Sequence, residues 1–320
     1  MRREFAFFVT ALLLVSAFTA CTGRKGEIGS EANPVRLYFM PLKGEEAFKA
    51  GAEAIEKFVE GRTGLAVEAV HANDFITIIK ALGQRKADAA FMNTLGYVLA
   101  HDWTKAEAHL KYLYGDVYSS YRGEILAQVG SGIETVADLQ GKRVAFADPY
   151  SAGGYIYPMK LLKEHSVTPG RIVFAKGHKN AVQMLYDGEV DAAATFHSQP
   201  SAGGLMRDAR TEIAEDHPDV ISKLKIIALT DEIPNGPIAT RYDIPDGVKQ
   251  KLVSALSDFS RTPEGRKTLF DLYNMTGLVQ TSDSDYDGVR AALKELNKTV
   301  QEVVPGGISF YRTYIVPGLE

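Results

Sequence analysis

Short apolar runs alternate with amphipathic stretches over most of this 320-residue chain. In its first third, runs with the two-residue alternation of a strand precede segments whose apolar residues recur at helical spacing. The predicted strands cover residues 35–40, 65–70 and 87–92, and the predicted helices cover residues 47–59, 75–82 and 95–101. Repeated alternation of strand and helix is typical of an α/β protein with a parallel sheet.

The alternation continues to the end of the chain. Further strands are predicted at 109–114, 124–129, 141–146, 172–175, 190–195 and 224–229, and further helices at 136–139, 156–162, 181–185, 248–259, 263–273 and 287–296. Two regions rich in strand–helix units predict two lobes, the first of which is discontinuous. We expect lobe 1 to contain residues 34–120 and 225–320, and lobe 2 to contain the inserted residues 121–224.

One loop combines the residue types that suit an anion. A predicted strand ends at Phe146, a loop rich in Pro, Ser and Gly follows, and apolar spacing from Ile156 predicts a helix. Free N–H groups at a helix start, with the helix dipole behind them, attract negative charge. Ser151 is suited to cap this helix or to donate to an oxygen, and Gly153 allows close approach to the main chain. A turn of this composition is also ordinary in α/β folds, so both interpretations stay open.

Other polar residues stand where predicted strands end. Ligands of open α/β sheets bind at the carboxyl ends of the strands. The positions selected by this rule are Pro41, Asn93, Tyr121, Ser151, His178, His197 and the loop 231–237. Asn93 and Thr94 equally suit the capping of the helix that follows them.

The N-terminus has the pattern of an export signal. Arg2 and Arg3 precede an uncharged apolar run over residues 5–20, which predicts a signal peptide over residues 1–20. The next residue, Cys21, is the only cysteine, and residues 18–21 resemble the lipobox of bacterial lipoproteins. We expect Cys21 to carry a lipid anchor, residues 21–33 to form a polar tether, and the protein to be exported and held at the extracytoplasmic, or periplasmic, face of a membrane.

Composition narrows the function classes. The formal net charge is −4 and no basic cluster is present, so we expect no nucleic-acid partner. The sequence lacks a Gly-x-Ser-x-Gly elbow, a His-Glu-x-x-His pair and a phosphate-binding loop, and its seven histidines lack the spacing of zinc ligands. We therefore predict a protein that is not an enzyme and has no catalytic residue, cofactor or metal. We also expect it to be a monomer.

Several segments together resemble one family. They are the run SGIETVADLQGKRVAFADPYSAGGY at 131–155, Gly177-His178, Asp74-Phe75 with Ile78, GEVDAAA at 188–194 and DYDGVR at 285–290. These segments resemble the substrate-binding proteins of phosphonate and phosphite ABC importers. The resemblance implies a two-lobed periplasmic-binding-protein fold, in which each lobe is a mixed, mainly parallel sheet flanked by helices and two strands form the hinge. It also implies a small anionic ligand and, as partners, an ABC permease with its ATPase.

The resemblance also implies a binding site. Tyr121, Ser151, His178 and the loop–helix amides around Ala152 and Gly153 would contact an oxyanion. The remaining predicted ligand-binding residues are Asn93, Thr94, Tyr150 and Phe75. Aromatic rings at the last two positions would wall a larger, partly apolar ligand.

Four positions depart from the family pattern. Ala152 and Gly153 stand where the family usually has Thr and Ser, so two hydroxyl donors are absent. Ser198 and Gly236 stand near positions where aminophosphonate binders hold an amine with acidic residues. We therefore do not expect aminoethylphosphonate as the ligand. Two other functions stay open, namely a periplasmic sensor that signals to a membrane receptor and an enzyme built on the same scaffold.

Overall fold

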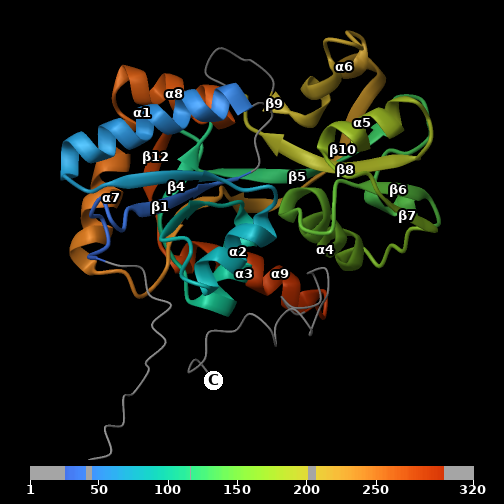
Figure 1. Cartoon of the computed structure of the whole chain (residues 1–320). Helices are drawn as coiled ribbons and strands as arrows, with labels where there is room; N and C mark the ends of the chain where they lie inside the picture. Colours follow the sequence, from blue (N-terminus) through green and yellow to red (C-terminus); the bar gives the residue numbers. More distant parts are fainter. Residues whose placement is uncertain (1–25, 41–44, 116, 201–206, 299–320) are drawn as a thin grey trace, which may run out of the picture.

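The computed structural model describes residues 26–40, 45–115, 117–200 and 207–298, and these form two β-sheets flanked by helices (Figure 1). The strands are β1 Val35–Phe39, β2 Val67–His71, β3 Ala89–Phe91, β4 Glu107–Leu113, β5 Ser120–Gln128, β6 Arg143–Phe146, β7 Arg171–Phe174, β8 Ala192–Ser198, β9 Arg207–Asp208, β10 Leu224–Pro234, β11 Pro237–Thr240 and β12 Gly277–Gln280. The α-helices are α1 Glu45–Thr63, α2 Phe75–Gly83, α3 Thr94–Thr104, α4 Tyr157–Glu164, α5 His178–Tyr186, α6 Val220–Lys223, α7 Asp246–Phe259, α8 Pro263–Tyr273 and α9 Asp287–Glu295. The other helical segments are η1 Val136–Leu139, the π-helical η2 Ala152–Ile156, η3 Ala209–Ile213 and η4 Asp283–Tyr286.

Each sheet is mixed. The first has the order β12-β4-β11-β3-β1-β2 and the second the order β10-β5-β8-β6-β7, with β9 paired to β8. Parallel pairing covers one half of each sheet, β2-β1-β3 and β7-β6-β8, while the other pairs are antiparallel. In Figure 1, α1 and α8 cover one face of the first sheet and α2 and α3 the other, and α4 and α5 lie on opposite faces of the second sheet. The expected two-lobed α/β fold is therefore confirmed, with antiparallel strands taking a larger share than predicted.

The chain crosses between the sheets in two adjacent segments. The first leads from β4 to β5 and the second from β10 to β11, and the N–H of Asn235 in the second donates to the carbonyl of Ser119 in the first at 3.0 Å. Strand β10 pairs antiparallel with β5, from Leu224 opposite Gln128 to Pro234 opposite Ser120. The return to the first sheet thus falls after Pro234, later than the predicted start of the second half of lobe 1 at residue 225. The cause is a pairing partner about a hundred residues away, which a local pattern does not specify.

Helix α9 also connects the lobes. It packs against α3 beside the first sheet and against α4 and η2 beside the second. Lys160 of α4 forms ion pairs with Asp231 at 3.0 Å and with Glu295 at 3.7 Å. The part of the chain assigned to lobe 1 by its sequence position therefore contacts both lobes.

The predicted tether is folded over the stretch that the structure describes. Gly29, with φ of 92°, allows a turn in which its N–H donates to the carbonyl of Asn33 at 2.8 Å. The carbonyl of Gly29 then accepts from the N–H of Ala66 at 2.7 Å, and Ile28 packs on the core of the first lobe. These contacts attach residues 26–33 of the predicted tether to the first lobe. The predicted signal peptide and Cys21 lie outside the described residues, and no helix within those residues is long and apolar enough to cross a membrane.

Side-chain caps fix where helices α2 and α3 begin. The Asp74 carboxylate accepts from the N–H of Thr77 at 2.7 Å at the start of α2, and the Asn93 side chain accepts from the N–H of Gly96 at 2.6 Å at the start of α3. One hydrophobic cluster then runs without a break from α2 and α3 through the crossing strands to η2 and α4. It includes Val98, Ile233 and Ile156, all fully buried. The two lobes therefore share a core beneath the region where they face each other.

Candidate functional site

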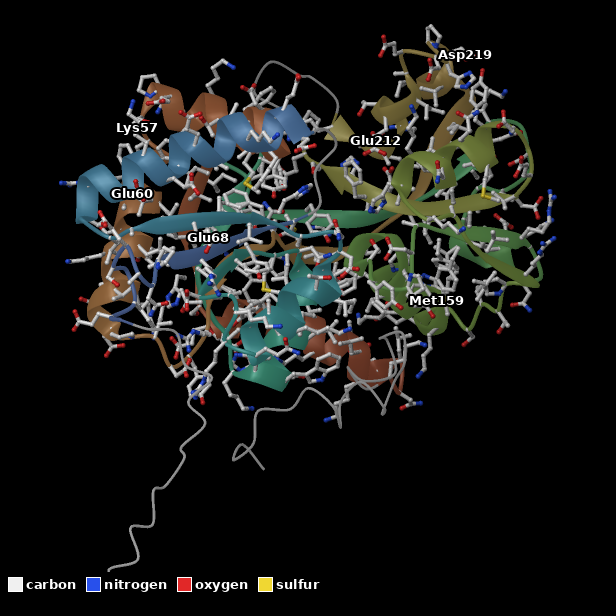
Figure 2. All side chains as sticks on the ribbon, viewed as in Figure 1. Lys57, Glu60, Glu68, Met159, Glu212 and Asp219 are labelled. Atoms are coloured by element: carbon white, nitrogen blue, oxygen red, sulfur yellow. The ribbon has the colours of Figure 1, made fainter. Side chains whose placement is uncertain are left out.

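A cavity of about 610 Å³ lies between the two sheets. It is within the usual range of small-molecule sites, about 300–1,000 Å³. The side chains and loops that line it come from both lobes: Met40, Asn93, Thr94, Leu95, Tyr112, Tyr114, Tyr121, Asp148, Tyr150, Ser151, Ala152, His178, Phe196, Ser198, Arg207, Thr211, Glu212, Asn235, Gly236, Phe270, Tyr273 and Asn274. Figure 2 shows Glu212 on the side of the second lobe that faces the first.

The loop after β6 turns directly into the start of η2. The N–H of Tyr150 donates to the Asp148 carboxylate at 2.8 Å, which closes the turn. The Ser151 hydroxyl oxygen then accepts from the N–H of Gly154 at 2.8 Å, as a helix cap does. The N–H of Ile156 donates to the Ser151 carbonyl at 3.1 Å, so this first turn is wider than an α-helical turn. Ser151 and Ala152 line the cavity at the positive end of this helical segment.

His178 stands beside Ser151 as an uncharged group. Its Nε2 lies 3.4 Å from the Ser151 hydroxyl oxygen, and its ring makes an edge contact with Phe196 at 5.0 Å between centroids. Burial lowers the pKa of His178 to about 4, so the imidazole is neutral near pH 7. Its Nδ1 is enclosed and forms no hydrogen bond within the described parts of the chain. A neutral imidazole donates one hydrogen bond to a ligand without adding charge.

Tyr121 joins the two lobes at the cavity wall. Burial raises the pKa of Tyr121 to about 12, while hydrogen bonds with the Thr94 side chain and the Gly153 main chain act in the opposite direction. The Thr94 hydroxyl also donates to the Pro234 carbonyl at 2.7 Å. The Tyr121 hydroxyl thus stays protonated and connects the start of α3 in lobe 1 with the start of η2 in lobe 2.

The structure brings most of the predicted site residues together. Asn93, Thr94, Tyr121, Tyr150, Ser151, Ala152 and His178 all line the one cavity. Phe75 and Gly153 are placed behind its wall. The Phe75 ring contacts the Tyr150 ring across the lobes at 5.0 Å between centroids, and a methyl carbon at Gly153 would stand 2.7 Å from the Tyr121 ring.

Sequence reasoning missed the side of the cavity away from Ser151. Tyr114, Phe270 and Tyr273 add aromatic rings from lobe 1, and Arg207 adds a cation from β9. Tyr114 follows the end of β4, so the rule of strand ends had the information to select it. Phe270 and Tyr273 gave no such signal, because apolar residues three apart on a helix are expected of any packed helix.

One cluster of titratable side chains lies outside the cavity wall. Ligand atoms of Glu124, His197 and Asp208 lie within 4.8 Å of one another. Asp208 already pairs with Arg210, whose Nη2 lies 2.8 Å from the carboxylate, and the Thr195 hydroxyl donates to Glu124 at 2.7 Å. Arg210 thus supplies the positive charge that a buried carboxylate needs, and the cluster serves as a hydrogen-bonded support for β9.

Comparison with known proteins connects this site to one group. The family model described as "ABC transporter, phosphonate, periplasmic substrate-binding protein" matches residues 37–286. The chain is 26% identical over 300 residues to the phosphate-import protein PhnD of Mycolicibacterium smegmatis, which covers 85% of this chain and 90% of the relative. It is 24% identical over 219 residues to the phosphonates-binding periplasmic protein of Escherichia coli, covering 66% and 62%.

Solved structures share the fold. A binding-protein component of an ABC phosphonate transporter from Pseudomonas aeruginosa superposes with a TM-score of 0.64 at 18% identity, covering 90% of this chain and 95% of that one. PhnD1 from Prochlorococcus marinus, in complex with methylphosphonate, superposes with a TM-score of 0.64 at 14% identity, covering 83% and 98%. XAC2383 from Xanthomonas citri, bound to ATP, reaches 0.67 at 15% identity, covering 88% and 100%.

Proposed function

Because the chain belongs to the family of periplasmic substrate-binding proteins of phosphonate ABC transporters, we propose that its cavity captures a phosphonate-like oxyanion. Membership implies an extracytoplasmic location and a small-molecule ligand. The observation that carries the proposal is the meeting of Ser151, Ala152, His178 and Tyr121 on one wall. Hydroxyl, amide and imidazole groups of this kind hold a tetrahedral oxyanion through short hydrogen bonds.

The binding mechanism follows from the state of these groups. The helical segment after Ser151 presents its positive end to the ligand, and the Ala152 N–H belongs to the first turn. The imidazole of His178 is neutral, so it contributes a hydrogen bond and no ion pair. The oxyanion is then held by dipoles rather than by an ion pair, and each hydrogen bond is stronger in the low-dielectric interior of a protein than in solvent.

Lobe closure completes the site. Residues of both lobes line the cavity, and the lobes touch at the Phe75–Tyr150 ring contact and at the Tyr121–Thr94 pair. A ligand that contacts both lobes favours the closed arrangement over an open one, because it gains all its contacts only there.

Two positions where aminophosphonate binders have an acidic residue are occupied here by Ser198 and Gly236. Both line the cavity. A side chain at Gly236 would place its first carbon 2.1 Å from the Met92 carbonyl oxygen and 2.9 Å from the Tyr112 ring, so the backbone here leaves no room for an acidic residue. These two positions therefore offer no acidic partner to the amine of an aminophosphonate, although Asp148 and Glu212 line other parts of the cavity.

The delivery partners follow from the family. We propose that the monomeric protein presents its ligand to an ABC permease driven by an ATPase, and that lipidation of Cys21 holds it at the membrane beside that permease. As a binding protein it would release the ligand chemically unchanged. Recovery of unmodified ligand after prolonged incubation distinguishes this role from catalysis.

A thermal-shift screen tests the proposal. The folded protein is heated with methylphosphonate, phosphite, phosphate and methanesulfonate, and a ligand at 100 times its Kd adds about 2.7 kcal/mol to the free energy of unfolding. We expect at least one phosphorus oxyanion to raise Tm and its affinity to fall in Ser151→Ala and His178→Ala. No shift with any phosphorus oxyanion, or unchanged affinity in both variants, would contradict the assignment.

A further inference from the structure

The cavity has two chemically different ends. The first, the oxyanion end, contains Ser151 and His178. The second, the distal end, is lined by Tyr114, Arg207 and Thr211. Arg207 is the one cationic side chain on the cavity wall within the described ranges, because the imidazole at the oxyanion end is neutral.

Strand geometry separates these ends. Phe196 contacts His178, and Ser198 lies two residues further along β8, a step of about 7 Å. Arg207 is the cross-strand partner of Ser198, which adds roughly 5 Å across the strands. Its guanidinium is then directed toward the crossing segment, where its carbon lies 5.7 Å from the centre of the Tyr114 ring. The Arg207 side chain therefore starts from a main-chain position away from Ser151 and extends to Tyr114, where it is available to a second group of the ligand.

The charge of Arg207 is not balanced by an ion pair within the part of the chain that the structure describes. Among the residues that the structure describes, no carboxylate lies within ion-pair distance of its guanidinium. Glu212 lines the same end but is itself already engaged in another interaction. The guanidinium carbon lies over the Tyr114 ring, a contact that uses the charge and none of the N–H donors, and a guanidinium can hold a planar anion such as a carboxylate through two of those donors.

Buried hydrogen bonds fix the main chain of β9 next to Arg207. The next residue, Asp208, is fully buried and accepts hydrogen bonds from the main chain and guanidinium of Arg210 at 2.8–3.0 Å. The same guanidinium donates to the Leu224 carbonyl at 2.8 Å, which ties β9 to the second sheet. The main chain that carries Arg207 is therefore fixed, so only the side chain has to be ordered when an anion binds.

The cavity is larger than an oxyanion alone requires. At about 30 Å³ for each water-sized group, 610 Å³ corresponds to about twenty such groups, whereas methylphosphonate has about five heavy atoms. Rings of Tyr150, Phe196 and Tyr273 also line the cavity. The room and its walls suit a flat or apolar body that extends from the oxyanion toward Arg207.

We propose that the ligand carries a second anionic group, separated from its phosphorus oxyanion by an apolar body, and that Arg207 recognises this group. The inference rests on the proposed function, since it requires the oxyanion at Ser151. Arg207 is then a specificity-determining residue, and it would discriminate phosphonocarboxylate-like ligands from simple alkylphosphonates.

A matched pair of ligands tests the inference in the full-length protein. Phenylphosphonate and 4-phosphonobenzoate differ only by a carboxylate at the far side of the ring. Calorimetric titration should show 4-phosphonobenzoate binding about 10- to 100-fold more tightly, the range for a charge-assisted hydrogen bond. Arg207→Gln should remove this difference and leave phenylphosphonate affinity within about threefold of the unsubstituted protein.

Two further variants serve as controls. Arg171→Gln removes an exposed arginine from β7 of the same sheet and should preserve the preference. Arg207→Lys keeps the positive charge, so it should retain part of the preference for 4-phosphonobenzoate over phenylphosphonate. This result would show that the loss in Arg207→Gln comes from the missing charge and not from misfolding. Equal affinity of the unsubstituted protein for both ligands, or an equal loss for both in Arg207→Gln, overturns the inference. If methylphosphonate, phosphite or phosphate binds in either of these cases, the proposed function stands without the inference. Failure of all three phosphonates overturns the inference, and the proposed function falls with it if phosphite and phosphate also fail to bind.

Discussion

Substitution of Ser151 separates two roles that the structure assigns to one hydroxyl group. The Ser151 oxygen caps η2 by accepting from the Gly154 N–H at 2.8 Å, and it faces the cavity. Aspartate caps a helix about as well as serine, but it brings a negative charge. Ser151→Asp should therefore keep the fold and abolish anion binding, whereas Ser151→Ala should weaken both.

The magnitudes follow from the contacts. A carboxylate about 4 Å from a bound anion costs about 4 kcal/mol at an effective dielectric constant of 20, which corresponds to nearly a thousandfold loss of affinity. Loss of the cap in Ser151→Ala costs about 1 kcal/mol of stability, or roughly 2–4 °C in Tm for a protein of this size class. Loss of a hydrogen bond to a charged ligand weakens binding by about 10- to 100-fold.

The assay pairs calorimetric titration of the best-bound phosphorus oxyanion with thermal denaturation. Thr262→Ala is a matched control, because Thr262 caps α8 through the N–H of Gly265 at 2.9 Å and does not line the cavity. It should lower Tm as Ser151→Ala does and leave the affinity unchanged. Binding to Ser151→Asp within threefold of the unsubstituted protein would refute the placement of an anion at the start of η2.

Three other substitutions test the surroundings of the site. Burial lowers the pKa of His178 to about 4, so between pH 4 and about pH 6.5 the unfolded chain binds more protons than the folded protein, and stability falls as the pH drops. His178→Gln should reduce this pH dependence of the free energy of unfolding, measured in urea titrations, by at most about 3 kcal/mol over the range. An unchanged pH dependence would contradict the burial of a neutral His178. Gly153→Ala places a methyl carbon 2.7 Å from the Tyr121 ring, so it should lower the free energy of unfolding by about 1–3 kcal/mol and weaken ligand binding. Gly61 has open space around it, so Gly61→Ala should neither destabilise the fold nor weaken binding in the same unfolding and titration experiments. Asp208→Asn leaves a buried guanidinium without its counter-charge and should cost about 3–5 kcal/mol in denaturant unfolding, and a loss below 1 kcal/mol would show that the pair contributes little.

Structural features that depend only on residues close together in the sequence could be predicted from the sequence. The caps at Asp74, Asn93 and Ser151 need only a polar side chain and an amide three residues later, and all three form hydrogen bonds of this kind. The alternation of strands and helices is equally local and predicted two α/β lobes. The assignment of β10 to the second sheet is not decided locally, because it depends on pairing with β5. The predicted lobe boundary at residue 225 therefore placed β10 in the wrong lobe.

The candidate site divides in the same way. Ligands of open α/β sheets bind at the carboxyl ends of the parallel strands, so Asn93 after β3 of the first sheet and Ser151 in the loop after β6 of the second were predictable from their positions in the chain. Arg207 lies in a short strand of two residues that pairs with the end of β8, and its position depends on a buried ion pair at Asp208. Phe270 is 51% exposed on the rim, yet in sequence it is one apolar residue of an amphipathic helix.

Phe75 and Gly153 show that a residue influences a ligand without touching it. The Phe75 ring supports Tyr150 from the opposite lobe, so its contact exists only when the lobes are together. Gly153 leaves the space that the Tyr121 ring fills, and that ring carries the hydroxyl shared with Thr94. Both residues therefore shape the closed cavity from one layer behind its wall. Since closure and binding are thermodynamically linked, a substitution at either position changes ligand affinity by changing how readily the lobes meet.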